Sequence, residues 1–407
     1  MRRVVVTGMG CISALGSEWE AVRSRLQEGR NAICYMPEWE VYQGLFTRLG
    51  GPISDFAKPA HYSRRSVRSM GRVALMSVRA TELALEDAGV LGDPILGNGQ
   101  VGIAYGSSTG STDATAEFGN MLINHVTEGI TATSYVRMMS HTAPVNIGVF
   151  FGIRGRVYTT SSACTSSSQG IGYGFEAIRH GLQTVMVCGG AEELCPTEAA
   201  VFDTLFATST RNDIPETTPR PFDRDRDGLV IGEGAATLVL EELEHAKARG
   251  APIIAEVLGY STNSDGRHVT QPDLESICRV LKASLQDAGV GSRDIGYISA
   301  HGTATDRGDV AESHAVLEVL GDQVPISALK SYTGHTLGAC GSTEAYVTLK
   351  MMHDGWFHPT LNLDCVASDC ADLDYIRGEG RTIDCEIAMS NNFAFGGINT
   401  SLIFRRV

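Results

Sequence analysis

The sequence predicts an α/β protein built from two units of similar size. Short runs of β-branched residues alternate with helical stretches, which is the rhythm of strands joined by crossover helices, and this rhythm occurs twice along the chain. The chain has 407 residues, more than the roughly 250 to 300 at which one core usually stops growing. No low-complexity linker separates the units, so we expect them to form one compact body.

The first unit, residues 1–251, has strands and helices of alternating pattern, and its last helix ends at a glycine, a common helix stop. The expected strands are VVVTG (4–8), VGIAYG (101–106), RVYTT (156–160), TVMVCGG (184–190) and the apolar run in GEGAATLVL, and the expected helices cover 17–29, 68–89 and 165–180.

The second unit, residues 252–407, repeats this order and closes with EIAMSNNFAFGGINTSLIFRR, two strands joined by a glycine-bearing loop. The rhythm suggests an internal duplication, with two sheets that have helices between them and outside them. The other expected strands are IIAEVLGYSTN (253–263), IGYISAHG (295–302) and VPISAL (324–329), and the expected helices cover 273–289, a segment from Asp309, and 338–354.

Composition and charge exclude several classes of protein. The net charge of −14 offers no excess of cations for nucleic-acid phosphates. No run approaches the roughly 18 apolar residues of a membrane span, and MRRVVVTGMG reaches glycines too early for a signal peptide. The ten cysteines lie mostly in apolar runs, which suits reduced thiols. We therefore expect a cytoplasmic protein with no nucleic-acid or membrane partner.

Cys164 is the first candidate for chemistry. In YTTSSACTSSSQG it follows an extended segment and precedes the expected helix 165–180. At a helix N-terminus the macrodipole favours thiolate, and free backbone N–H groups can stabilise an oxyanion. A buried structural thiol is the alternative, as for the other cysteines.

Two histidines follow strands in glycine-rich loops. His301 lies in IGYISAHGTATDRGD and His335 in ISALKSYTGHTLGACG, with Lys330 five residues upstream. Either histidine alone would be explained as well by a structural role. Together with Cys164 they match the needs of carbon–carbon bond formation on thioesters. A cysteine thioester holds one acyl group, and neutral imidazole N–H groups bind the thioester oxygen on which charge collects as a malonyl unit loses carbon dioxide.

Three short motifs suggest other chemistries. Gly106–Gly110 reads G-x-S-x-G and would make Ser108 the nucleophile of a serine hydrolase, but STDATAEFG does not strongly predict the helix that should follow. Gly8–Gly10 after the first strand suggests dinucleotide binding, but Ser13 replaces the third glycine, which favours a tight strand-to-helix turn. PFDRDRDG lacks the remaining ligands of a calcium loop, and we interpret it as a salt-bridged loop.

Over nearly its full length the chain resembles β-ketoacyl-acyl carrier protein synthases of the elongating types I and II. The matching segments are VVVTGMGCISALG, SSACTSSSQGIG, RPFDRDRDGLVIGEGAA, SAHGTATDRGDVAE, LKSYTGHTLGACG and SNNFAFGGINTSLIF. The resemblance implies a thiolase-like fold, two βαβαβαββ halves in a five-layered α-β-α-β-α arrangement. It also implies decarboxylative Claisen condensation of an acyl group on cysteine with malonyl-acyl carrier protein, giving 3-oxoacyl-acyl carrier protein in fatty acid elongation. A polyketide-type ketosynthase with the same chemistry is the alternative.

The resemblance also implies roles for single residues. Cys164 is similar to the acyl-accepting nucleophile, and His301 and His335 to the pair that supports decarboxylation. Lys330 and Glu344 resemble a supporting ion pair. Asp309 and Glu312 resemble supporting carboxylates, which the dipole of the following helix would favour in any case. Phe393 and Phe395 resemble gating residues, and the backbone N–H of Phe395 resembles the second oxyanion donor beside that of Cys164. Some members also hold a monovalent cation near residues that match Glu344, Ser390 and Asn391.

The motifs also indicate the subclass. The second histidine, in TGHTLG, differs from the Cys-His-Asn arrangement of initiating type III synthases. GAEELCPTE and STRNDIPETTPRPFDRDRDG look more like type I than type II. Retention of Cys164 and both histidines argues against a chain-length factor, a partner subunit without the nucleophile. The loop GSSTGSTDATAEFGNM and Asp306, which stands where proline is usual, depart from the family pattern and leave the chain-length preference open.

The resemblance implies two partners and no bound cofactor. An acidic acyl carrier protein would deliver both substrates on its phosphopantetheine arm, so an acidic enzyme should meet it with a basic patch. Arg65 and Arg68 in HYSRRSVRSMGR, and Arg211 in STRND, resemble the carrier-binding residues. A second copy of the chain is the other expected partner, because family members pair their first-half sheets, and the strand RVYTT suits such an edge.

Overall fold

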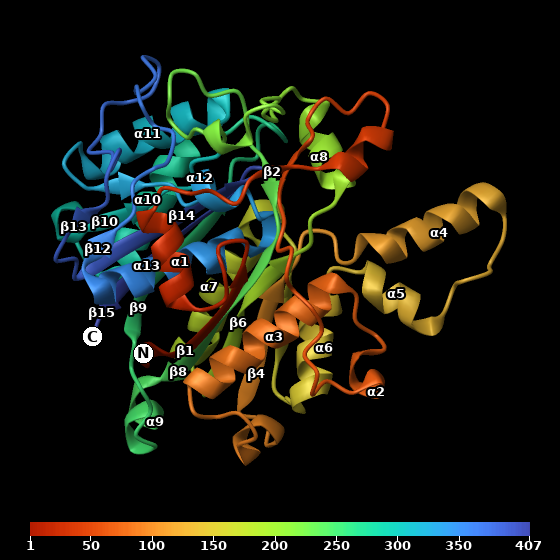
Figure 1. The fold of residues 1–407 in the computed structure, drawn as a ribbon. Helices are drawn as coiled ribbons and strands as arrows, with labels where there is room; N and C mark the ends of the chain where they lie inside the picture. The colour runs from red at the N-terminus through yellow and green to blue at the C-terminus, as the bar shows by residue number, and fades with distance from the viewer.

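The computed structural model describes residues 1–407 and is organised around one ten-stranded sheet (Figure 1). The strand order is β11-β10-β14-β15-β9-β1-β8-β6-β4-β5. The strands of the first half are β1 (Val4–Ser13), β4 (Val101–Gly106), β5 (Val157–Thr160), β6 (Val185–Glu192) and β8 (Gly234–Glu242), and those of the second are β9 (Ala255–Ser264), β10 (Tyr297–Ser299), β11 (Ile326–Ser327), β14 (Ile387–Ala394) and β15 (Ile398–Arg406).

The two halves share one topology, which confirms the predicted duplication. In the first half β1 pairs antiparallel with β8, β8 antiparallel with β6, β6 parallel with β4, and β4 parallel with β5. In the second half β9, β15, β14, β10 and β11 repeat the same order and directions. The halves are joined differently from the expectation of two separate sheets. Val4–Val6 of β1 pairs antiparallel with residues 255–257 of β9, so the hydrogen-bonded sheet is continuous.

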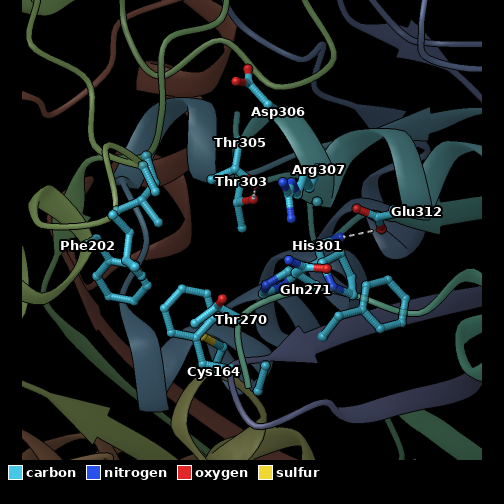
Figure 2. A pocket seen from close by; sticks show the side chains of 18 of the residues that line it. Cys164, Phe202, Thr270, Gln271, His301, Thr303, Thr305, Asp306, Arg307 and Glu312 are labelled. Carbon is cyan, nitrogen blue, oxygen red and sulfur yellow. Dashed lines mark hydrogen bonds between the residues drawn. The ribbon is translucent and has the colours of Figure 1, made fainter. Parts of the chain in front are cut away.

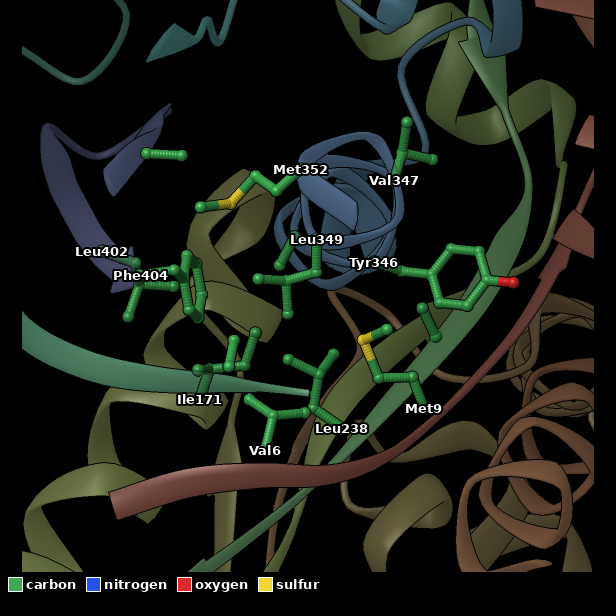
Figure 3. Close-up of a cluster of buried hydrophobic side chains, with 14 of the residues drawn as sticks. Val6, Met9, Ile171, Leu238, Tyr346, Val347, Leu349, Met352, Leu402 and Phe404 are labelled. Carbon is green, nitrogen blue, oxygen red and sulfur yellow. The ribbon is translucent and has the colours of Figure 1, made fainter. Parts of the chain in front are cut away.

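Helices complete the five layers. On the first half, α3 (Arg72–Asp87) and α6 (Thr142–Phe151) cover the outer face, and on the second half α10 (Leu274–Ala288) and α11 (Asp306–Leu320) do so. Between the halves lie α7 (Ser166–Arg179) and α13 (Cys340–Asp354), which contact strands of both. Figure 3 shows this central layer, in which Ile171 and Leu349 lie between Val6 and Phe404. The middle layer matters for function, because α7 and α13 begin at the site described below.

Among the helices that were not predicted are α4 (Thr112–Asn124) and α5 (Ala132–Met138). Only Ala114 of α4 and Ser134 of α5 are buried, so neither helix has the apolar stripe from which a core-facing helix is recognised. Both project from the body (Figure 1). The remaining helices are α1 (Trp19–Gln27), α2 (Arg64–Val67), α8 (Pro196–Asp203), α9 (Leu243–Ala248) and α12 (Lys330–Thr333), and the short strands are β2 (Cys34–Tyr35), β3 (Leu49–Gly51), β7 (Ile231–Gly232), β12 (Trp356–Phe357) and β13 (Arg381–Thr382).

Gly8 and Gly10 lie inside β1 and not in a strand-to-helix turn. A Cβ at Gly8 would lie 2.3 Å from the carbonyl oxygen of Ala84, and one at Gly10 would lie 2.2 Å from that of Ala80. The glycines therefore allow the backbone of α3 to approach the strand closely. This packing explains the pair without a bound dinucleotide.

The expected boundary at residues 251 and 252 lies in the loop between α9 and β9. α11 begins at Asp306, three residues before Asp309, where the sequence predicted its start. The carboxylates of Asp306 and Asp309 both lie in its first turn, where the helix dipole favours them. Among the helices, none combines the length and the apolarity needed to cross a membrane.

Candidate active site

Cys164, His301 and His335 meet in one buried site at the junction of the two halves. Figure 2 shows Cys164 and His301 in the pocket that they line. Cys164 lies in a helical turn, Ala163–Thr165, that leads into α7. His301 follows β10, and His335 lies between α12 and α13. The Cys164 sulfur and one ring nitrogen of each histidine all lie within 4.8 Å of one another. The structure thus brings together the three side chains that the sequence singled out.

The turn at Cys164 is strained. Ala163 has a φ of +50°, in the left-handed region that L-residues rarely adopt. This conformation turns the chain sharply from the end of β5 into α7. Strain of this kind persists where the surrounding structure fixes it, often at functional sites. Here it holds the Cys164 sulfur within the cluster at the start of the helix.

His335 has a defined tautomer. The backbone N–H of Leu337 donates to its Nδ1 at 3.2 Å, so Nδ1 accepts and the proton of the neutral ring lies on Nε2. Nε2 is 3.0 Å from Cys164 Sγ. Burial, with the charge of Lys330 second, lowers the pKa of His335 well below its usual value. The ring therefore presents a neutral Nε2–H donor to the site.

His301 has the same tautomer for a different reason. The Lys330 ammonium lies 3.1 Å from its Nδ1 and carries only donors, so Nδ1 must accept and Nε2 carries the proton. Burial, then the charges of Lys330 and His335, lower the pKa of His301 well below its usual value. The two rings are edge-on, with centroids 5.2 Å apart. Two neutral imidazole N–H donors are thus available in one site.

Lys330 links His301 to α13. It donates to the His301 carbonyl oxygen at 2.6 Å and forms an ion pair with Glu344, and both partners are 2% exposed. Although burial alone would lower it, the charge of Glu344 raises the pKa of Lys330, so the ammonium stays charged. Asn392 donates to Glu344 at 2.7 Å and lies 3.4 Å from His301 Nδ1. Asn392 was not predicted from the sequence; its neighbour Phe393 in SNNF was the available signal.

Asp309 and Glu312 shape the loop that carries His301. Glu312 accepts from the backbone N–H groups of His301 and Gly302, each at 2.7 Å. Asp309 accepts from Thr303 at 3.0 Å and Ala304 at 3.1 Å. Burial raises the pKa of Glu312 to about 8 and that of Asp309 to about 6, against the opposing effect of these hydrogen bonds. Both carboxylates therefore hold the backbone of the loop, and neither forms a hydrogen bond to a histidine ring.

Cys164 departs from the expectation of a thiolate favoured by the helix. Burial raises its pKa to about 11, although the charge of Lys330 and the backbone N–H groups of Phe395 and Cys164 itself act in the opposite direction. A thiol that is 3% exposed loses the hydration that would stabilise its anion. In the resting site the cysteine is therefore a neutral thiol.

A cavity of about 400 Å³ opens over these three side chains. Phe393 and Phe395 both line it. The Phe395 ring packs on Phe202 of α8 at 4.8 Å between centroids, and the Phe393 ring lies edge-on to His301 at 5.9 Å. Two aromatic side chains thus line the cavity beside the candidate catalytic residues, and their role as gating residues stays a prediction.

Two residues of the cation site expected near Glu344, Ser390 and Asn391, lie on opposite faces of β14. Successive strand side chains point to opposite faces, and Asn392 faces Glu344. Ser390 therefore shares that face, while the side chain of Asn391 points away from Glu344. Ser390 Oγ and both polar side-chain atoms of Asn391 are buried without a hydrogen-bond partner.

Ser108 lacks the partners of a hydrolase nucleophile. Its backbone N–H donates to Glu192 at 2.7 Å, and its Oγ is buried with no hydrogen-bond partner. A serine nucleophile needs a base within hydrogen-bond reach. A helix does follow the motif, α4, contrary to the sequence analysis, but it begins at Thr112 and does not bring a base to the hydroxyl.

The expected carrier-binding arginines do not form one patch. Arg65 of α2 and Arg68 at its end are exposed and form no ion pair. Figure 1 shows α2 far from α8, which borders the cavity. Arg211 is already engaged, 3.4 Å from Asp227 and donating to the Asp225 carbonyl at 2.7 Å.

The acidic loop at 220–228 is salt-bridged, as expected. Arg220 donates to Asp223 at 3.1 Å and to Asp364 at 2.7 Å, and Arg226 pairs with Asp369 at 3.0 Å. Its carboxylates are thereby oriented toward arginines and backbone N–H groups.

Comparisons with known proteins agree on one family. The family model for the β-ketoacyl synthase N-terminal domain matches residues 1–246, and that for the C-terminal domain matches residues 254–364. The 3-oxoacyl-[acyl-carrier-protein] synthase 2 of Vibrio harveyi is 37% identical, covering 100% of this chain and 99% of the relative. A crystal structure of a β-ketoacyl synthase from Burkholderia phymatum is 57% identical with a TM-score of 0.99, covering 100% of both chains. The ketosynthase in AntDE:AntF, a type II polyketide complex with its acyl carrier protein, is 29% identical with a TM-score of 0.88, covering 100% and 99% of the two chains.

Proposed function

The chain belongs to the β-ketoacyl synthase family, and we infer that it condenses an acyl group, held as a thioester on Cys164, with malonyl-acyl carrier protein. The product is 3-oxoacyl-acyl carrier protein, and carbon dioxide is released. The observation that carries this inference is the convergence of one thiol and two neutral Nε2–H donors on one cavity. Such a set can both accept an acyl group and stabilise an enolate.

In the first half-reaction the Cys164 sulfur attacks the acyl thioester carbonyl. The new carbon–sulfur bond forms, the bond to the phosphopantetheine sulfur breaks, and the proton of the Cys164 thiol ends on that departing sulfur, which leaves as a thiol. The backbone N–H groups of Cys164 and Phe395 serve as donors to the tetrahedral oxyanion. The same two N–H groups lower the pKa of the sulfur, which supports this role.

In the second half-reaction malonyl thioester loses carbon dioxide. The electrons of the breaking carbon–carbon bond collect on the thioester oxygen as an enolate, and the Nε2–H groups of His301 and His335 donate to that oxygen. The enolate carbon then attacks the acyl carbonyl on Cys164, and the bond to the cysteine breaks. The cysteine leaves as a thiolate and takes up one proton from water, which restores the neutral thiol. Because both histidines are held neutral, they can donate hydrogen bonds without giving up a full proton.

Mass spectrometry after incubation with a fatty acyl thioester tests this assignment. We expect one acyl group, mapped to the peptide with Cys164 and absent from a Cys164→Ser variant. Acyl on Ser108 would support the hydrolase, and no acylation would support a non-catalytic subunit.

A polyketide-type ketosynthase is the second candidate, supported by the likeness to the ketosynthase in AntDE:AntF. Both candidates use the same half-reactions and differ in the acyl chains that they extend. Turnover with a series of acyl-carrier substrates, short to long and saturated to unsaturated, separates them. Iterative extension without reduction would favour the polyketide enzyme.

Acyl carrier protein is the proposed partner that delivers both substrates, and phosphopantetheine on that partner is the carrier group. The exposed, unpaired Arg65 and Arg68 support this proposal, because a carrier protein is larger than its arm and can touch the enzyme away from the cavity. The site needs no other cofactor for these steps. A monovalent cation near Glu344 and Ser390 stays a proposal, supported by the unpartnered Ser390 hydroxyl.

A homodimer in the cytoplasm is the proposed working form. β5 is an edge strand, and Val157 on it is 48% exposed. Unpaired edges are ready templates for a second chain. All ten cysteines are free, which suits a reducing compartment.

A further inference from the structure

Arg307 is a charged side chain without a partner at the mouth of the active-site cavity. It lies in the first turn of α11, is exposed, and takes part in no hydrogen bond or ion pair. It lines the cavity above Cys164 and also the adjoining surface hollow, which contains Gln271 and His314. A substrate arm that runs from the surface to the cysteine passes this side chain.

Two other charged side chains that line the cavity, Arg226 and Asp227, already have partners. Arg226 pairs with Asp369 at 3.0 Å. Asp227 accepts from Ser209 Oγ at 2.9 Å and lies 3.4 Å from Arg211. Arg307 is therefore the cation of this cavity that stays available for a ligand.

The three other acidic residues that line the cavity do not take up this charge. Glu312 is bound to the backbone N–H groups of the His301 loop. In Figure 2 the Arg307 guanidinium lies above His301, toward the middle of the pocket, while the Asp306 carboxylate lies at the upper edge and points away. Asp265 accepts from Asn399 at 2.6 Å. The pocket side of Arg307 is thus open to an anion.

We propose that Arg307 binds an anionic oxyacid group of the incoming substrate and so helps to select carrier-bound substrates. The inference rests on the proposed function. A guanidinium presents a planar fork that matches phosphate and carboxylate oxygens, and the N-terminal turn of α11 adds a favourable dipole. Two groups of a malonyl-carrier substrate have this chemistry: the phosphate of the phosphopantetheine arm and the free carboxylate of the malonyl unit. The position of Arg307 between the cavity and the outer hollow favours the phosphate.

Four small thioesters distinguish these sources: malonyl-phosphopantetheine, malonyl-pantetheine, acetyl-phosphopantetheine and acetyl-pantetheine. Condensation or acylation of Cys164 is measured for the wild type, Arg307→Gln and Arg307→Lys. Arg293→Gln is the matched control, because Arg293 is also exposed and unpaired but lines neither hollow. If phosphate is the ligand, Arg307→Gln raises KM roughly 10-fold for the two phosphorylated substrates only, as expected for a lost charged hydrogen bond. If carboxylate is the ligand, the rise is confined to the two malonyl substrates.

Arg307→Lys should give intermediate KM values, since an ammonium keeps the charge but not the fork. An unchanged KM for all four substrates would overturn the proposal, as would an equal rise that includes acetyl-pantetheine, which carries no anion. Calorimetric binding of free phosphopantetheine, pantetheine and malonate to the same variants needs no turnover. A wild type that fails to condense would therefore refute the proposed function, while the loss or retention of anion binding in Arg307→Gln still decides this inference.

Discussion

Cys164 and the two histidines face one cavity, but the chemistry assigns them to different half-reactions. Cys164→Gln should abolish acyl-enzyme and condensation while carbon dioxide release from malonyl-carrier stays measurable, because decarboxylation needs no nucleophile. His301→Ala or His335→Ala should slow decarboxylation by roughly 10² to 10³ per lost donor, while some acylation survives. Release of labelled carbon dioxide and mass spectrometry of the acyl-enzyme measure the two steps. Normal condensation by His301→Ala would contradict this division of labour.

The reactivity of Cys164 should depend steeply on pH. With the pKa raised by burial to about 11, the thiolate fraction increases with pH until the solution reaches that value. Alkylation by iodoacetamide should therefore accelerate about 100-fold from pH 7 to pH 9, tenfold per pH unit, without a plateau. Peptide mapping separates Cys164 from the exposed Cys365, which serves as an internal reference. A plateau below pH 8 would mean that the helix N-terminus stabilises the thiolate more than burial destabilises it.

Lys330 supports both the fold and the tautomer of His301. Lys330→Ala should lower the free energy of unfolding by about 3 to 5 kcal/mol, because it leaves Glu344 charged, buried and unpaired. It should also slow decarboxylation, because His301 Nδ1 loses its donor. Urea denaturation and carbon dioxide release measure the two effects. Lys330→Met combined with Glu344→Gln should recover part of the stability but not the rate, and recovery of both would show that Lys330 acts only through the ion pair.

Among the elements, α2 has the clearest expected role in partner binding. Arg65→Glu with Arg68→Glu should raise KM for acyl-carrier protein roughly 10-fold and spare a small pantetheine thioester, because reversed charges repel an acidic partner. The effect should shrink as salt is added. Arg293→Glu, a charge reversal on another exposed arginine, is the control. Equal losses with both substrates would assign the arginines to the fold instead of the carrier.

The other elements show where the local sequence predicts the bounds of a helix or strand and where it does not. β4 has the predicted bounds, and α10 lies one residue inside its predicted ends, where the Asp273 side chain caps it and Gly289 adopts a φ of +68°. α4 and α5 had no apolar stripe to reveal them, because only one residue of each helix is buried. A helix that does not pack on the core needs no regular spacing of apolar residues, so its sequence does not predict it.

For the whole molecule we predict a homodimer that forms through the edge of the sheet. Light scattering at micromolar concentration should give twice the mass of one chain. Val157→Asp on β5 should shift the protein toward monomer, because a charge on an edge strand opposes pairing. Val41→Asp, which changes an equally apolar residue that is 75% exposed in another region, is the control. A wild-type monomer would refute the dimer.

The sequence by itself determined the repeated α/β order and the side chains to examine. The position between an extended segment and an expected helix indicated Cys164. Glycine-rich loops after strands indicated His301 and His335, because loops at strand ends carry function on a rigid scaffold. The tertiary structure decided how these residues act. His335 and Cys164 are 171 positions apart, and their contact exists only because α7 and α13 pack in one layer. The tautomers, the neutral thiol, the contacts of Asn392 and the open side of Arg307 depend on burial and on partners distant in sequence. The local sequence shows which face of a helix or strand is apolar. The pKa of a side chain and its hydrogen bonds depend instead on all the residues that tertiary packing places beside it.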